Sequence, residues 1–161
     1  MTTEQYNTCV KWHSDGVYRF ILKNIRDEDK AKDIVQDSFE KLWIQASKIS
    51  FDKSKSYLFS TAYHKMIDKI RKDKKIVDID DKDKPEQFHN KSYTGLNEIL
   101  NSALEKLSDI QRSVILLRDY EGYSYNEIAD LTDLNESQVK VYIYRGRLAL
   151  KKYIGSIEAV I

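Results

Sequence analysis

Apolar side chains recur every three or four residues along most of this 161-residue chain, which is the spacing of amphipathic α-helices. The spacing predicts helices over residues 5–25, 29–47, 54–73, 97–107, 109–120, 124–131 and 136–153. No stretch alternates apolar and polar residues for long enough to predict a sheet. The fold class predicted by this pattern is therefore all-α.

Between the third and fourth predicted helices the periodicity is lost. Residues 76–95 contain the only proline, Pro85, together with Gly95 and five acidic residues. Such a composition is typical of a linker. We therefore predict two small helical domains, residues 1–75 and 97–155, joined by a flexible acidic linker over 76–96.

Helical wheels divide the second and third helices into a buried and an outward side. In the second helix, one arc is apolar or small: Ala31, Ile34, Val35, Ser38, Phe39, Leu42 and Ala46. The opposite side carries Asp33, Gln36, Asp37 and Glu40, with Trp43 at the border. The buried stripe of the third helix comprises Leu58, Phe59, Ala62, Tyr63, Met66, Ile67 and Ile70. Its outward side comprises Thr61, His64, Lys65, Asp68, Arg71 and Lys72.

The net charge of +1 conceals an uneven distribution. Residues 50–75 carry eight Lys or Arg against three Asp, and residues 136–153 carry five against one Glu. The segments between these two blocks are acidic. Two basic blocks are consistent with two contacts to a polyanion such as nucleic acid, although a basic block is more often a solvated surface.

Several classes of protein are disfavoured by what the sequence lacks. No apolar run resembles a signal peptide or approaches about 18 residues, so we expect a soluble cytoplasmic protein. The single cysteine, Cys9, excludes an internal disulfide and is expected to be a small buried residue. His13, His64 and His89 show no ligand spacing, and no glycine-rich phosphate loop is present. We therefore expect no metal, no cofactor and no catalytic residues.

Residues 124–145 meet the steric demands of a helix-turn-helix. Ile128 and Leu134 are apolar where the first helix and the turn face the core, and Ala129 is small where the second helix crosses it. Asp133 lies at the turn position that needs a positive φ, which Asp tolerates better than most residues. Asn135 can cap the second helix. The motif is shared with structural and protein-binding domains, but the basic second helix favours DNA.

The second helix of this motif also has two distinct sides. Its inward positions are Val139, Tyr142, Ile143 and Gly146. Candidates for contact with base edges are Glu136, Ser137, Lys140 and Tyr144. Candidates for contact with phosphate are Arg145, Arg147 and Lys151.

The C-terminal segment LSDIQRSVILLRDYEGYSYNEIADLTDLNESQVKVYIYRGRLALKK (107–152) resembles the C-terminal domain of extracytoplasmic-function (ECF) sigma factors of bacterial RNA polymerase. The matching positions are Leu107, Gln111, Arg112, Glu121, Gly122, Ser124, Tyr125, Glu127, Ile128, Ala129, Val139, Lys140, Arg145 and Arg147. The resemblance implies that this domain reads the promoter −35 element and contacts the β flap of the polymerase. The usual small polar and Arg residues are replaced by Val141 and Tyr142, which affects the promoter sequence rather than the function.

Two N-terminal segments resemble the same family independently. DIVQDSFEKLW (33–43) is similar to the helix that docks on the β′ coiled coil, which implies a docking face of Asp33, Gln36, Asp37, Phe39 and Trp43. YLFSTAYHKMIDKIRKDKK (57–75) is similar to the segment that opens and reads the −10 element together with the loop 48–56. The implied −10 contacts are Phe51, Lys53, Lys55, Tyr57, His64, Lys65, Arg71 and Lys72. Tyr63 and His64 replace the basic residue and Asn that are common in the family.

Members of this family have no chemical step of their own. The resemblance implies that core RNA polymerase positions both domains on promoter DNA, and that an anti-sigma factor, membrane-bound in many cases, holds the protein inactive. One alternative is a stand-alone helix-turn-helix transcriptional regulator, which leaves the face at Asp33, Gln36 and Asp37 without a role. A second is a metal-assisted hydrolase, for which Cys9 and the three histidines are the ligand candidates.

Overall fold

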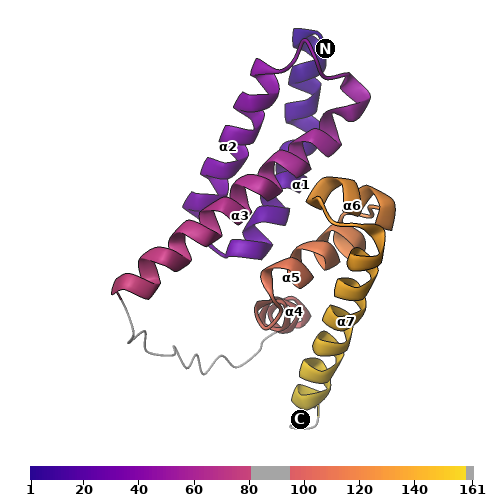
Figure 1. Ribbon diagram of the computed structural model, residues 1–161. Coiled ribbons are helices and arrows are strands. Elements are labelled where there is room, and N and C mark those ends of the chain that lie inside the picture. Colours follow the sequence, from indigo (N-terminus) through magenta and orange to yellow (C-terminus); the bar gives the residue numbers. More distant parts are fainter. Residues whose placement is uncertain (81–94, 159–161) are drawn as a thin grey trace.

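The computed structural model describes residues 1–80 and 95–158, with backbone alone for 77–80 and 157–158. Residues 81–94, which include most of the predicted linker and His89, lie outside the described residues. Every regular element in the described part is helical, which confirms the all-α prediction. Two helical regions are visible in Figure 1. The first contains α1 (Thr3–Ile25), α2 (Glu28–Ile44), the short 3₁₀ helix η1 (Phe51–Lys53) and α3 (Ser54–Asp80). The second contains α4 (Leu96–Glu105), α5 (Asp109–Ile115), a π-helical turn η2 (Leu116–Tyr120), α6 (Tyr125–Thr132) and α7 (Glu136–Glu158).

Two helices extend beyond their predicted ends. The helix α3 continues to Asp80, into the segment predicted as linker, and α7 continues past residue 153 to Glu158. Neither extension contains a proline, so nothing in the backbone ends the helix at the predicted residue. In α7 the apolar spacing itself continues through Ile154 and Ile157, so the predicted end at residue 153 was too early.

The first region is a three-helix bundle. Its core is formed by fully buried side chains that include Phe20, Leu42, Phe59 and Met66. Most of the predicted buried arc of α2 is buried, and Asp33, Gln36, Asp37 and Glu40 are exposed as predicted. Cys9 is fully buried, and its thiol donates a hydrogen bond to Ser54 Oγ at 3.0 Å, which confirms its predicted structural place.

The second region packs α5 tightly against α7. Gly146 is buried, and a Cβ atom placed on it would collide with Ile115 Cδ1. The absence of a side chain at Gly146 therefore permits the close approach of the two helices. Val139 and Ile143 are buried on the same side of α7 and Tyr142 is half-buried, as the sequence predicts.

The two regions are packed against each other through α1, α3, α4, α5 and α6 (Figure 1). Rings of the first region meet the second where Phe59 lies 5.5 Å from Tyr123, centroid to centroid. A polar contact lies beside them: Ser113 Oγ donates to Asn24 Oδ1 at 3.0 Å, and Arg112 Nη1 donates to the Asn24 carbonyl at 3.1 Å. All three polar residues are buried. Because unpaired polar groups are costly to bury, this matched set indicates a specific interface.

Arg112 also joins two elements of its own region. Its guanidinium donates to the carbonyl oxygens of Leu104, in the last turn of α4, and of Leu107, just after that helix. Burial is the main cause that lowers the pKa of Arg112, and the nearby Asp109 carboxylate opposes it. The family motif residue Arg112 therefore has a structural role in this fold.

Candidate polymerase and nucleic-acid interfaces

The predicted polymerase-docking face lies on the outward side of α2. Asp33, Gln36 and Asp37 are exposed, and Trp43 is 51% exposed beside them, with its ring centroid 4.9 Å from that of Tyr6. Phe39, which the sequence assigned to the same face, is instead only 8% exposed and belongs to the core. Its carbonyl accepts a hydrogen bond from the Tyr6 hydroxyl at 3.0 Å. The structure thus brings four of the five residues to one surface and places Phe39 beneath it.

The predicted −10 loop is an ordered turn that leads into α3. Phe51 begins η1 and is half-buried, while Lys53 and Lys55 are exposed and Tyr57 is half-buried. Lys55 Nζ lies 5.3 Å from the centroid of the Tyr123 ring, a residue of the second region. The loop therefore lies at the edge of the interface between the two regions.

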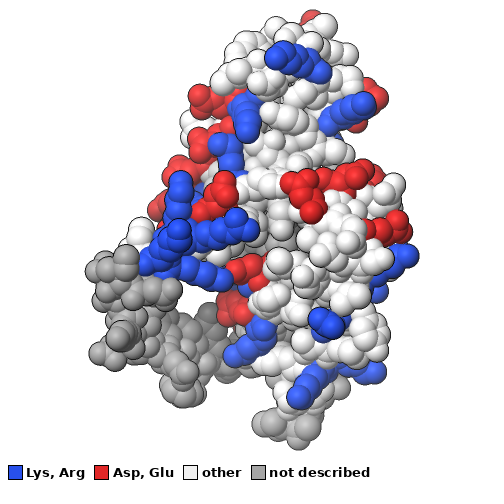
Figure 2. Space-filling model, viewed as in Figure 1, with Lys and Arg blue, Asp and Glu red and all other residues white. Residues whose placement is uncertain are grey.

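The outward face of α3 is exposed in its C-terminal half, whereas nearer the start of the helix it contacts the second region. Arg71 and Lys72 are exposed, and Figure 2 shows basic side chains gathered over the C-terminal half of α3 with acidic ones beside them. Nearer the start of the helix, His64 and Lys65 are half-buried. The predicted −10 residues are thus divided between an open end and an end that the second region approaches.

The helix-turn-helix itself covers this second end. His64 Nε2 lies 2.9 Å from Asp133 Oδ2, and the Ser60 hydroxyl donates to the Leu131 carbonyl at 3.2 Å. Asp133 is the turn residue between α6 and α7. Sequence reasoning did not find Ser60 or this contact, because no pattern links residues about seventy positions apart.

Ion pairs between the two regions extend the contact. Arg19 makes a two-pronged interaction with Glu121, with nitrogen–oxygen distances of 3.0–3.2 Å, and the Glu121 carboxylate is largely buried. Lys74 contacts Asp109 at 2.8 Å, and Arg26 contacts Glu105 at 3.3 Å. The two more exposed pairs, of Lys74 and of Arg26, contribute little stability individually, whereas the Arg19–Glu121 pair fixes how the two regions are placed.

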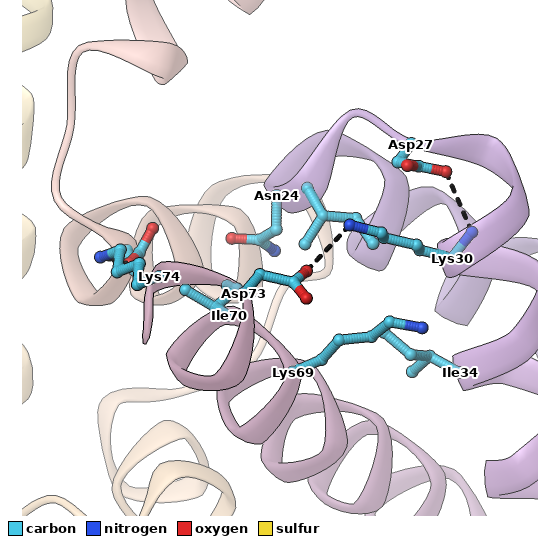
Figure 3. Close-up of a pocket in the computed structure, with 10 residues that line it drawn as sticks. Asn24, Asp27, Lys30, Ile34, Lys69, Ile70, Asp73 and Lys74 are labelled. Carbon is cyan, nitrogen blue, oxygen red and sulfur yellow. Dashed lines mark hydrogen bonds and ion pairs between the residues drawn. The ribbon is translucent and has the colours of Figure 1, made fainter. Parts of the chain in front are cut away.

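A hollow of about 410 Å³ lies where the ends of α1 and α3 meet α2 and the start of α5 (Figure 3). Its polar walls are lysines and aspartates that neutralise one another, such as Lys30 and Asp73 at 2.9 Å. The hydrogen bond from Lys30 is the main cause that lowers the pKa of Asp73, and the same bond raises the pKa of Lys30. No group of three or more potential metal ligands occurs among the described residues.

The helix-turn-helix has the local geometry that its sequence predicts. Asp133 has φ of 57°, in the left-handed region, and Asn135 Oδ1 accepts from the Gln138 amide at 2.8 Å. Ser124 and Glu127 form a reciprocal capping box at the start of α6, with distances of 3.1 and 3.0 Å. Hydrogen bonds from Ser124 lower the pKa of Glu127. These two motif residues therefore begin a helix and are not free to contact DNA.

The outward face of α7 is open. Glu136, Ser137, Lys140 and Tyr144 are exposed, with Tyr144 66% exposed, and Arg145 and Lys151 are exposed as well. Lys140 is 3.5 Å from Glu136 one turn away. Arg147, assigned to phosphate contact, instead forms an ion pair with Asp119 at 2.6 Å, and the hydrogen bond that its guanidinium donates to Asp119 is the main cause that raises its pKa. A single surface thus presents the predicted −35 residues, with Arg147 partly engaged elsewhere.

Comparison with known proteins places these two regions in one family. The family model Sigma-70 region 2 matches residues 9–76, and the model Sigma-70, region 4 matches residues 97–150. RNA polymerase sigma factor SigV of Bacillus subtilis is 32% identical over 144 residues, which cover 86% of this chain and 84% of SigV. The chain belongs to the extracytoplasmic-function sigma factors of the sigma-70 family.

Other relatives support the same membership. ECF RNA polymerase sigma factor SigM of Bacillus subtilis is 28% identical over 144 residues, covering 86% of this chain and 88% of SigM. Among solved structures, the sigma factor RpoE in complex with the anti-sigma factor NepR from Bartonella quintana superposes with a TM-score of 0.81 at 24% identity. That match covers 95% of this chain and 98% of RpoE, so the fold extends over both regions. The protein is thus a sigma factor that directs promoter-specific transcription initiation. No helix within the described residues combines the length and the apolarity that a membrane crossing needs.

Proposed function

We propose that the first region docks on the β′ coiled coil of core RNA polymerase and reads the −10 element, while the second region contacts the β flap and reads the −35 element. The domains are residues 1–75 and 97–155, and the acidic segment 76–96 joins them. The observation that carries this proposal is the pairing of an exposed polar face at Asp33, Gln36 and Asp37 with an exposed recognition face on α7 in one chain. A stand-alone regulator would need only the second of these surfaces.

The protein acts by binding and has no catalytic step, and it works in the cytoplasm with core polymerase. Lys53, Lys55, Arg71 and Lys72 supply exposed positive charge to the −10 surface. Phosphate contacts of this kind give a strongly salt-dependent affinity and little sequence preference. Specificity therefore comes from the unpaired −10 bases and from the −35 base edges, read together in the holoenzyme.

We further infer that an anti-sigma factor, possibly anchored in a membrane, holds the packed arrangement of the two regions. Two solved structures with this fold are complexes of that type: RpoE with NepR, and CnrH with the cytosolic domain of CnrY. In the packed arrangement the helix-turn-helix contacts His64, one of the predicted −10 residues, whose side chain remains 43% exposed. A partner that stabilises this arrangement would keep the −10 surface from DNA.

The docking face is tested by co-purification with core polymerase. A variant with Asp33→Ala, Gln36→Ala and Asp37→Ala should bind core at least tenfold more weakly, because these polar groups make the contact. Glu28→Ala is the matched control, since Glu28 is also an exposed carboxylate on α2 but lies on a different side of the helix from Asp33, Gln36 and Asp37. Failure of the unaltered protein to bind core, or equal binding by the triple variant and the control, would contradict the proposal.

A further inference from the structure

Trp12 is the most exposed tryptophan of the protein. Its side chain is 63% exposed on α1, whereas tryptophan is usually among the more buried residues. The nearest aromatic ring outside α1 belongs to Phe51 in η1, with centroids 5.8 Å apart and planes inclined by 54°. Two rings from separate elements therefore form one aromatic patch, and Trp12 is its outer member.

The surroundings of this patch are charged, with lysines in excess. Lys11, Lys53 and Lys55 are exposed and lie within four residues of one ring or the other along the chain, as do the exposed Asp15 and Asp52. His13, whose ring centroid is 6.3 Å from that of Trp12, has its pKa lowered by burial first and by the charge of Lys55 second. Both effects disfavour the charged imidazole, so the positive charge beside the rings comes from the lysines.

We propose that Trp12 is a stacking platform for one unpaired base of the non-template strand, adjacent to the base that the loop around Phe51 receives. This rests on the proposed −10 role of that loop. Aromatic faces interleaved with lysines are the composition of single-strand binding surfaces, since bases stack on the rings while phosphates meet the ammonium groups. A protein-binding patch of the same size would be depleted of lysine at its centre.

The position of Trp12 also agrees with this role. It is anchored on a 23-residue helix whose neighbouring turns are buried at Cys9 and Val17, so its backbone is held while the indole remains in solvent. The ring meets Phe51 at an inclined angle and not face to face, so the contact leaves most of its surface uncovered. A rigid aromatic group loses little conformational entropy when a base stacks on it.

The test uses holoenzyme and a forked promoter fragment in which the non-template −10 strand is unpaired. Trp12→Ala should weaken binding about tenfold, whereas Trp12→Phe, which retains a ring, should remain within about threefold of the unaltered protein. Single abasic sites are then placed along the strand. An abasic site at the stacking position should weaken binding of the unaltered holoenzyme. The same abasic site should leave the affinity of the Trp12→Ala holoenzyme unchanged, because the ring on which that base stacks is already absent.

Three controls separate the possible failures. Leu96→Ala removes an apolar side chain that is 70% exposed at the start of α4, and it should leave forked-fragment binding unchanged. Core affinity and melting temperature of Trp12→Ala should match those of the unaltered protein; a drop in core affinity would make Trp12 a polymerase contact and overturn the proposal. If Trp12→Ala binds the forked fragment as tightly as the unaltered protein while Phe51→Ala binds it more weakly, the stacking role of Trp12 is overturned and the −10 role of the loop stands. No binding by the unaltered holoenzyme would overturn the −10 role of the whole surface.

Discussion

Asp133 illustrates how a single residue can serve both the fold and the interface. The turn between α6 and α7 needs a left-handed residue, and Asp133 adopts φ of 57° there. Its carboxylate also lies 2.9 Å from His64 Nε2 on the other region. The sequence predicts the first property, because the spacing of a helix-turn-helix fixes the turn position, but it contains no signal for the second.

The backbone demand at this turn can be separated from the contact with His64 by two substitutions. Asp133→Ala and Asp133→Gly both remove the carboxylate, but only glycine adopts the left-handed region without a steric penalty. The alanine variant should therefore be less stable than the glycine variant by about 1 kcal/mol in urea unfolding. Equal free energies of unfolding would show that the turn relaxes and that the positive φ is not required.

Single residues of the candidate sites were predicted with uneven success. Exposure on α2 and α7 follows from helical periodicity, so Asp33, Gln36, Lys140 and Tyr144 lie on the surface as expected. Phe39 was assigned to the docking face through the family resemblance, although its own periodicity had placed it in the buried arc. The side of the helix was the better guide in this case.

At the scale of elements, α5 and α7 show why one glycine is constrained and another is not. Both Gly146 and Gly155 lie within α7, where glycine weakens a helix relative to alanine. A Cβ at Gly146 would collide with the buried Ile115, whereas a Cβ at Gly155 would meet nothing within 4 Å. The periodicity predicts that Gly146 faces inward, but the tightness of the contact is visible only in the structure.

The same substitution at these two glycines should therefore have opposite effects. Gly146→Ala should lower the free energy of unfolding by about 1–2 kcal/mol, because overpacking exceeds the gain in helix propensity. Gly155→Ala should raise it by up to about 1 kcal/mol. Thermal or urea unfolding of the two variants provides the measurement, and a stabilised Gly146→Ala would mean that α5 and α7 can separate at little cost.

At the scale of the molecule, the main finding beyond the sequence is the packing of the two regions. The all-α class and the division of the chain follow from periodicity and from the acidic segment 76–95. The buried contact of Asn24 with Arg112 and Ser113 does not, because polar residues on helices are ordinarily expected to face solvent. Tertiary packing between distant segments has no local pattern in a single sequence.

This packed arrangement should be incompatible with initiation, since the helix-turn-helix contacts His64, a predicted −10 residue, and the two regions are held against each other. Arg19 and Glu121 form an ion pair across the interface. In the double variant Arg19→Cys with Glu121→Cys, the two thiols can be joined by a cleavable bifunctional reagent. Cys9 is fully buried and so protected from the reagent. The joined protein should direct less than about a tenth of normal transcription with core polymerase, and cleavage of the reagent should restore activity.

Each single-cysteine variant, treated in the same way, controls for modification of the individual positions. Full activity of the joined protein would show that the regions read DNA without separating. Loss of activity that cleavage does not reverse would point to damage at the modified side chains and would leave no support for an opening step.

The central claim is that this chain makes core RNA polymerase specific for promoters through two separate surfaces. Transcription by purified core polymerase on a genomic promoter library tests it most directly, with the chain present or absent. We predict transcripts with defined start sites only when chain and core are combined, and their loss when the triple variant of Asp33, Gln36 and Asp37 replaces the chain. Promoter DNA binding by the chain alone, with no transcript from any promoter when core is added, would contradict the account and favour a stand-alone regulator.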